Sequence, residues 1–299
     1  MSKDNPIYDR RLIINTLLST ILLFILTGTK LFAQGTEIFV KKSQGFFIGF
    51  NINPAHTYIN NSGTKPIKDI VTSGKYMVSG SLEAGFFLNR NIGLSAGIGY
   101  NSYSSELSLA EYSDSLTTKD TEQETYRRII SGIEISETQK IGLLSVPVLV
   151  NLNIPFNDNF GLFLQTGINL SLPVTKKYIS SGKMTYKGYY PAYAVYIYGI
   201  DHEDFATDVV SEEEGTLMVK SFDPELVISG GFQFGLEKKI QIIAGFFFNK
   251  LLSDVSDYPV TSSYYLSMKK NDMNSLMQGS TKATAQAIGI KIGFMYFLR

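Results

Sequence analysis

The stretch Ser145-Val-Pro-Val-Leu-Val-Asn-Leu-Asn-Ile-Pro-Phe-Asn-Asp-Asn-Phe-Gly-Leu-Phe-Leu-Gln-Thr-Gly-Ile-Asn-Leu-Ser-Leu172 decides the fold. Apolar residues alternate with small or polar ones on both sides of the turn formers Asn157-Asp158-Asn159. A period of two is that of a β-strand, so the stretch predicts an antiparallel hairpin with one apolar face. This face carries no charge over roughly the 9–11 residues that a tilted strand needs to cross a bilayer.

The same alternation recurs along the rest of the chain. It predicts eight strands, at about 44–59, 76–88, 92–101, 144–154, 160–172, 226–237, 240–249 and 287–298. Short turns separate some of them, whereas about 60–73, 104–132, 175–223 and 251–281 form long connections. We therefore predict an all-β fold, namely an eight-stranded antiparallel transmembrane up-and-down β-barrel with short periplasmic turns and long extracellular loops. An even number of crossings places both ends of the barrel on the periplasmic side.

The N-terminus has the order of a secretory signal peptide. A positive flank at Arg10-Arg11 precedes the apolar run Leu12–Leu26, and small residues follow up to Ala33. A retained membrane anchor is the alternative. The predicted organisation is a signal peptide over 1–33, an N-terminal periplasmic segment over 34–43 and the barrel domain over 44–299. Export through this route places the barrel in the outer membrane of a Gram-negative cell.

Composition restricts the chemistry of the chain. The net charge is zero, which gives no indication of a nucleic-acid partner. Absence of cysteine excludes disulfides, thiol catalysis and thiolate metal sites. The 26 glycines, 18 tyrosines and 20 phenylalanines suit a membrane barrel.

A soluble β-sandwich or a lipocalin-like barrel is the competing architecture. A lipocalin-like barrel points its large apolar residues inward, whereas here the apolar face is the richer one in every strand and the opposite face is dense in glycine. The lumen of an eight-stranded barrel is just wide enough to be filled by side chains. We expect the lumen to hold a set of phenylalanines among polar neighbours, namely Phe47, Phe87, Phe163, Phe247 and Phe297.

Two charged residues fall on the predicted lumen face. Glu83 and Lys291 lie at similar heights on strands that only the first strand separates. Because isolated charges in a narrow lumen are costly to desolvate, we expect the two side chains to meet. The pair would be a structural plug of the lumen; a gate or a proton path is the alternative.

Catalytic and metal-binding patterns are weak. His56 lies at the top of the first strand, and His202 lies in Asp201-His202-Glu203-Asp204, which lacks a defined ligand spacing and is read as an exposed acidic loop. The sequence contains no recognisable nucleophile–base set, zinc motif or phosphate loop. We therefore predict no catalytic residues, no cofactor and no metal, with a hydrolase at the barrel rim as the alternative.

The connection at 175–223 is rich in tyrosine. Exposed tyrosines give rigid, amphipathic contact area, which favours a protein or glycan partner. The alternative is that they pack within the connection, extend the strands as a hairpin, or form the outer interfacial girdle. The residues of this candidate binding surface are Tyr186, Tyr189, Tyr190, Tyr193, Tyr196 and Tyr198.

The chain resembles the PorT-like outer-membrane β-barrel family, whose architecture is that of OmpA and OmpX. The resemblance rests on Phe32-Ala33-Gln34, on Ser145-Val-Pro-Val-Leu-Val with Phe163-Leu-Gln-Thr-Gly-Ile-Asn, and on the terminal Gly293-Phe-Met-Tyr-Phe-Leu-Arg299. It implies an eight-stranded barrel and, by analogy with the eponymous member, a role as an accessory component of protein secretion.

The function that we expect is that of a non-catalytic outer-membrane barrel with a structural, binding or accessory role through its extracellular loops. A small-solute channel and a barrel enzyme are the alternatives, beside the secretion accessory. Its partners would be outer-membrane lipid and a protein or glycan at the loops. The barrel would be monomeric or a subunit of a larger outer-membrane complex.

Overall fold

Eight long strands carry the fold. The computed structural model describes residues 45–62, 70–200, 205–259 and 264–298. Within these ranges it contains β1 (Gly45–Ser62), β2 (Val71–Phe87), β3 (Ile92–Lys119), β4 (Thr125–Pro155), β5 (Phe160–Tyr190), β6 (Val195–Ile197), β7 (Val209–Thr216), β8 (Asp223–Phe234), β9 (Ile240–Leu251), the 3-10 helix η2 (Leu276–Gly279) and β10 (Lys282–Leu298). They belong to a compact unit that begins at Gln44. The predicted signal peptide and the segment 34–43 lie outside the described residues and stay predictions.

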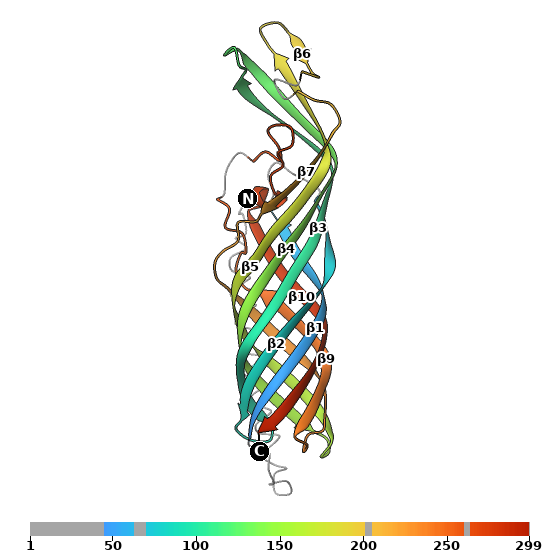
Figure 1. Ribbon diagram of the computed structural model, residues 1–299, viewed down its shortest axis with the longest axis vertical. Helices are drawn as coiled ribbons and strands as arrows, with labels where there is room; N and C mark the ends of the chain where they lie inside the picture. The colour runs from blue at the N-terminus through green and yellow to red at the C-terminus, as the bar shows by residue number, and fades with distance from the viewer. Residues whose placement is uncertain (1–44, 63–69, 201–204, 260–263, 299) are drawn as a thin grey trace, which may run out of the picture. The chain divides into compact units, whose positions relative to one another are not determined.

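The strands pair as a ring. Each of β1 to β4 pairs antiparallel with the strand that follows it. β5 then pairs with β8, β8 with β9, and β9 with β10. β10 pairs with β1, from Phe46 opposite Leu298 to Ser62 opposite Lys282, which joins the first strand to the last (Figure 1). The prediction of eight successive antiparallel strands is confirmed. β6 and β7 are two additional short strands, and both pair with β5 outside the ring.

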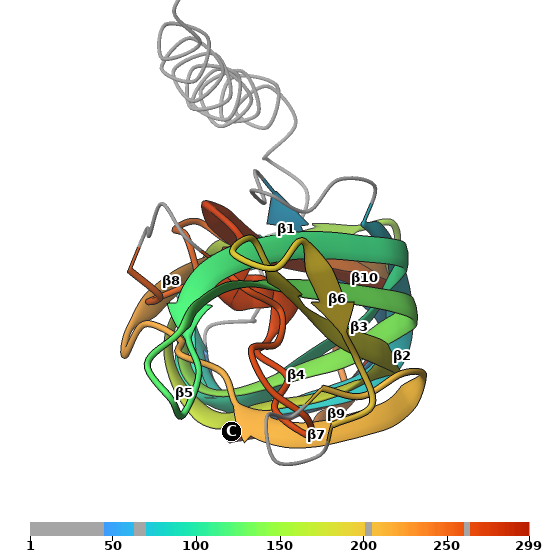
Figure 2. The ribbon, with the colours of Figure 1, turned by 90° about the horizontal axis from the view of Figure 1, so that it is seen from above.

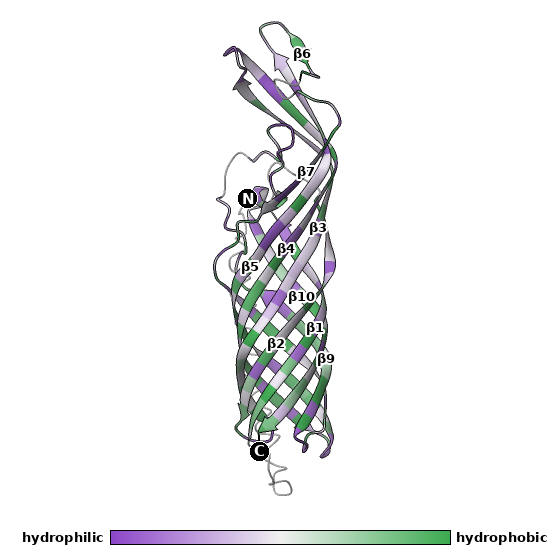
Figure 3. Ribbon diagram, in the orientation of Figure 1, coloured by the Kyte–Doolittle hydropathy of each residue, from purple (hydrophilic) through white to green (hydrophobic). Residues whose placement is uncertain are grey.

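The two faces of the ring differ as the alternation predicts. Along β4, Val146, Val148 and Val150 are 38–54% exposed on the outside, while Leu149 between them and the flanking Ser145 and Asn151 are buried inside. Hydrophobic residues concentrate on the half of the strands nearer the short turns (Figure 3). The five phenylalanines predicted for the lumen, Phe47, Phe87, Phe163, Phe247 and Phe297, are all buried. This outward apolar band suits a lipid environment and is the reverse of the lipocalin-like alternative.

Asparagine side chains close two of the short turns in the same way. Asn89 Oδ1 accepts hydrogen bonds of 2.8 Å from the backbone N–H groups of Asn91 and Ile92. Asn157 Oδ1 accepts bonds of 2.9 Å from Asn159 and Phe160. An asparagine that bonds to its own backbone two residues on is a common turn former, which explains why these strands reverse so sharply.

The prediction of a long loop over residues 104–132 is wrong. β3 continues to Lys119, a five-residue turn follows, and β4 begins at Thr125, so most of the segment is a long hairpin. Its inward residues Leu107, Leu109 and Ile130 are buried in a hydrophobic cluster, whereas the charged residues point mainly outward. The inward residues therefore keep the period of two beyond the apolar band. The strands are hard to recognise there from the sequence because their outward residues are polar instead of apolar.

The connection predicted over 175–223 also contains strands. β5 continues to Tyr190, and β6 and β7 fold back against it. Strands β3, β4 and β5 thus continue the barrel wall as a sheet beyond the apolar band; we call this part the extension. Its outermost portion, the turn 120–124 together with residues 189–198, is called the tip (Figure 1).

The described residues of the connection between β9 and β10, 252–259 and 264–281, are called the mouth segment. Part of this segment crosses the inside of the ring (Figure 2). Val255 and Met277 pack with Ala55 and Ile141 of the wall, and Leu276 packs with Leu107. The mouth segment therefore places apolar side chains in the opening of the ring that lies away from the short turns. Among the described residues, no helix is long and apolar enough to cross a membrane.

Candidate functional site

The two charges predicted for the lumen meet. Glu83 Oε1 and Lys291 Nζ are 3.8 Å apart, and both side chains are almost completely buried. Glu83 on β2 lies opposite Gly49 and Gly97, and Lys291 on β10 lies opposite Gly245. Because glycine has no side chain, these neighbours leave room for two long side chains at one level of a narrow lumen.

Amide and hydroxyl groups complete the shell of the charged pair. Glu83 accepts hydrogen bonds from Asn51 Nδ2 at 2.8 Å, Ser81 Oγ at 3.0 Å and Gln165 Nε2 at 3.0 Å. Gln165 Oε1 in turn accepts a hydrogen bond from Lys291 Nζ. Buried charges are tolerated when they are both paired and hydrogen-bonded, and this network meets both conditions. We call it the lumen network.

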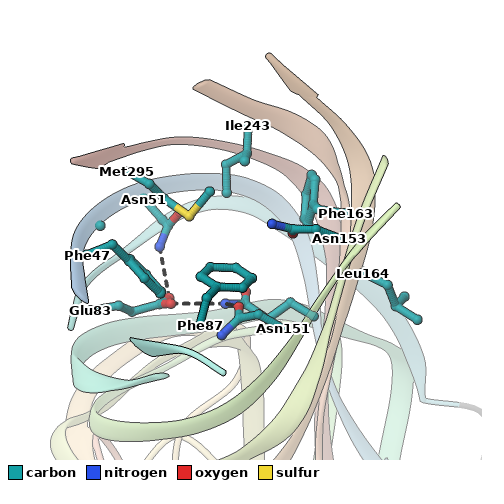
Figure 4. Close-up of a pocket in the computed structure, with 12 residues that line it drawn as sticks. Phe47, Asn51, Glu83, Phe87, Asn151, Asn153, Phe163, Leu164, Ile243 and Met295 are labelled. Atoms are coloured by element: carbon teal, nitrogen blue, oxygen red, sulfur yellow. Dashed lines mark hydrogen bonds between the residues drawn. The ribbon is translucent and has the colours of Figure 1, made fainter. Parts of the chain in front are cut away.

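An aromatic cluster fills the lumen between the lumen network and the short turns. The ring centroids of Phe47 and Phe87 are 5.5 Å apart, and Phe297 lies 5.6 Å from Phe47. Figure 4 shows Phe47 and Phe87 directly beside Glu83 and its bond to Asn51. The cluster comprises Phe47, Phe87, Phe163, Ile243, Met295 and Phe297.

A second buried carboxylate lies on the side of the network away from the short turns. Glu225 accepts hydrogen bonds of 2.8 Å from Asn101 Nδ2 and Asn169 Nδ2, and a further bond from the Tyr103 hydroxyl. In the part of the chain that the structure describes, no cation lies within ion-pair distance of Glu225. Glu225 was missed because the predicted strand began at Leu226. Val227 and Ser229 point into the lumen, and continuing their two-residue spacing toward the N-terminus leads to Glu225.

Little free volume remains between these layers. Cavities of about 20 Å³ and 30 Å³ flank the lumen network. A cavity of this size holds one or two water molecules. The lumen can therefore hold buried water beside the lumen network.

A third carboxylate joins the mouth segment to the wall. Glu137 of β4 is fully buried and accepts hydrogen bonds from Ser275 Oγ at 2.8 Å and from the backbone N–H of Leu276 at 2.7 Å. Gln139 Nε2 and Ser180 Oγ of the wall donate at 2.6 Å and 2.7 Å. Burial raises the pKa of this carboxyl above its usual value, and the four donors oppose the rise. Glu137 was missed because it lies where no strand was predicted beyond the apolar band.

The six tyrosines of the predicted binding surface divide into two groups. Tyr186 and Tyr190 are buried, with the Tyr186 hydroxyl 2.6 Å from Ser267 Oγ, so neither is available to a partner in this structure. Tyr193, Tyr196 and Tyr198 are exposed by 62%, 58% and 63%. Tyr189 is half-buried, and its ring lies 4.7 Å from that of Tyr196.

The histidines show no catalytic arrangement among the described residues. His56 lies half-buried on the outer face of β1, with its ring 4.7 Å from the ring of Tyr58 and 4.8 Å from that of Tyr76. His202 and its acidic neighbours lie outside the described residues. Within the described ranges, no group of three or more histidine or acidic residues could hold a metal ion.

An antiparallel ring of eight strands, an outward apolar band and a lumen filled by side chains define an integral β-barrel membrane protein. The family model described as "Outer membrane protein beta-barrel domain" matches residues 32–259, and the chain belongs to this family. The protein is accordingly located in the outer membrane.

Several solved structures are similar to the chain. Neisserial surface protein A (NspA) is 12% identical with a TM-score of 0.36, over 86% of this chain and 100% of that one. Ail of Yersinia pestis is 9% identical with a TM-score of 0.27, over 85% and 100%. The translocator domain of the autotransporter NalP from Neisseria meningitidis is 9% identical with a TM-score of 0.24, over 93% and 97%. No curated protein matches the sequence.

Proposed function

We propose that the protein is a non-catalytic, non-conducting outer-membrane barrel that presents its tip to a protein or glycan partner. The observation that carries the proposal is the exposure of Tyr193, Tyr196 and Tyr198 at the end of a sheet that continues the barrel wall. Exposed tyrosines bring large contact area at a low cost in conformational entropy, which is why they are frequent in binding surfaces.

Contacts between the two halves of the tip support this role. The Tyr193 hydroxyl donates to Glu124 Oε1 at 2.8 Å, and the Tyr190 hydroxyl donates to Asp120 Oδ2 at 3.0 Å. The Tyr190 ring also stacks on Tyr126, with centroids 5.2 Å apart. A surface held in this way loses little freedom on binding, so more of the contact energy appears as affinity.

The filled lumen supports the non-conducting part of the proposal. The aromatic cluster, the lumen network and the mouth segment follow one another along the lumen, and the first two bring together side chains from several strands. A channel would need each of these layers to open. An enzyme would need a base beside a nucleophile, and His56 packs against tyrosines on the outer face instead.

A role as an accessory of protein secretion is the second candidate. It rests on the similarity of the hairpin over residues 145–172 to that of PorT-like barrels. In that case the partner at the tip, or at another exposed surface of the extension, would be a subunit of a secretion complex. The two candidates differ in the identity of the partner.

The test is affinity purification from cross-linked outer membranes with the partners identified by mass spectrometry. The variant Tyr193→Ser/Tyr196→Ser/Tyr198→Ser is compared with Tyr76→Ser, an exposed tyrosine on the wall. We expect a stoichiometric partner with the wild type and the control that is lost from the triple variant. Recovery of the barrel alone, or of the same partner with the triple variant, would overturn the proposal. A secretion subunit as the partner would favour the second candidate.

A further inference from the structure

Two lysines face each other on the outer wall. Lys140 of β4 and Lys177 of β5 are directly opposite in the register, and both are exposed on the same face. Like charges in directly opposite positions destabilise a sheet. Lys177 Nζ has a carboxylate partner, Glu214 Oε1 at 3.0 Å. Across the described ranges, Lys140 has none within ion-pair distance, so the pair retains an uncompensated positive charge.

Neighbouring residues show how far Lys140 and Lys177 lie from the apolar band. On the membrane side of the lysines, Leu144 and Leu172 lie opposite each other and are about half exposed. They are the last outward apolar pair of β4 and β5 before the pairing register shifts between Gly142 and Leu143. Next, the ring of Tyr100 lies over Gly142, where a Cβ would overlap its hydroxyl. Amphipathic aromatic residues lie at the membrane–water interface. The lysines follow within four or five residues, roughly 10 Å along the membrane normal for a tilted strand.

The charges around the pair are nearly balanced. Lys75 Nζ lies 3.1 Å from Glu106 Oε2 and donates to Thr138 Oγ1, also at 3.1 Å. Thr138 is two residues beyond Lys140 on the same face of β4. Glu106 and Glu214 thus compensate Lys75 and Lys177, and Lys140 supplies the excess positive charge beside the interface.

We propose that Lys140 and Lys177 bind the phosphate of an outer-leaflet lipid headgroup. A phosphate between the two ammonium groups removes their repulsion, and the acyl chains of the same molecule run along the apolar band below Leu144 and Leu172. This continuity between the cationic pair and the apolar band favours a lipid over a free anion. The inference does not rest on the proposed function of the tip, because the two surfaces are separate.

The test is native mass spectrometry of the full chain, released from detergent, with lipid A as the probe. Dephosphorylated lipid A and inorganic phosphate are the comparison ligands. We expect the wild type to retain lipid A in preference to the dephosphorylated form. Each lysine near a membrane surface contributes about five-fold to the affinity for anionic lipid. Lys140→Gln/Lys177→Gln should therefore lower the retention more than ten-fold.

Two further variants make the result specific. Lys187→Gln removes a lysine from the same face of β5, farther from the apolar band, and should change the retention less than two-fold. Lys140→Arg/Lys177→Arg keeps both charges and should restore it. Equal retention by the glutamine variant, equal retention of dephosphorylated lipid A, or displacement of lipid A by an equal concentration of inorganic phosphate would overturn the proposal.

Discussion

Glu83 and Lys291 form a buried ion pair of 3.8 Å between two strands that flank β1, and Gln165 from the far side of the ring binds both partners. The contact therefore connects β2, β10 and β5 through one set of side chains. Its two charges are shielded from water, so each depends on the other for compensation.

We predict that removing either charge strongly destabilises the barrel. Glu83→Gln or Lys291→Met leaves one buried charge without its partner, and the expected loss of unfolding free energy is about 3–5 kcal/mol for each single variant. The double variant leaves no charge uncompensated and should lose less than the sum of the two. The measurement is urea unfolding of the folded barrel in lipid vesicles. Strictly additive losses would show that the two charges do not interact.

The sequence predicts the pair but not its shell. Two charges on one face of a strand pattern, at similar heights and on nearby strands, are sufficient to expect Glu83 beside Lys291. The choice of Asn51 and Gln165 as partners depends on side-chain conformations across the lumen. The sequence shows only that these positions point inward, where any of several amides would fit.

We predict that the aromatic cluster contributes stability without acting as the only barrier. Phe87→Ala removes ring contacts to Phe47 and Phe297, at centroid distances of 5.5 Å and 5.9 Å, and should cost about 3–5 kcal/mol. Phe86→Ala, which points outward to lipid from the adjacent position, should cost less. Conductance across planar bilayers should stay absent in Phe87→Ala, because the lumen network still closes the barrel. Stepwise conductance in this variant would contradict that expectation.

We predict that the paired glycines of β8 and β9 are required for close strand approach. Gly231 lies opposite Gly245, and a Cβ at Gly245 would overlap the backbone of Gly230 and Gly231. Gly245→Ala should therefore destabilise the barrel by about 1–3 kcal/mol in urea unfolding. Gly230→Ala is the matched control, since its Cβ would be 3.4 Å from the Phe163 carbonyl, an ordinary contact. Equal stability of the two variants would disprove the steric explanation.

The extension could be predicted only in part. Its inward residues, such as Leu107, Leu109 and Ile130, keep the period of two, whereas the outward residues change from apolar to charged where the wall leaves the membrane. A search for lipid-facing strands therefore ends at the apolar band although the strands continue. The position of the mouth segment inside the ring depends on contacts between distant parts of the chain, and no local pattern contains them.

We predict that closure of the mouth segment weakens as pH rises. With the segment closed, burial raises the pKa of Glu137 above the usual 4.5; with the segment open, water restores the usual value. The closed state then binds the proton more tightly, so its stability is fully present below the usual pKa and is lost as pH rises through the raised one. Hydrogen exchange of residues 264–279, corrected for intrinsic rates, should show protection that falls over this range.

The variant Glu137→Gln separates this effect from general changes with pH. It keeps the shape of the side chain but cannot ionise, so the protection of residues 264–279 should become independent of pH. Glu134→Gln is the matched control, because Glu134 is exposed on the same strand and pairs with Lys183 at 2.6 Å on the outside. It should keep the wild-type profile. If Glu137→Gln retains the pH dependence, a group other than Glu137 controls closure, and the four hydrogen bonds to its carboxylate serve only to fix the mouth segment in place.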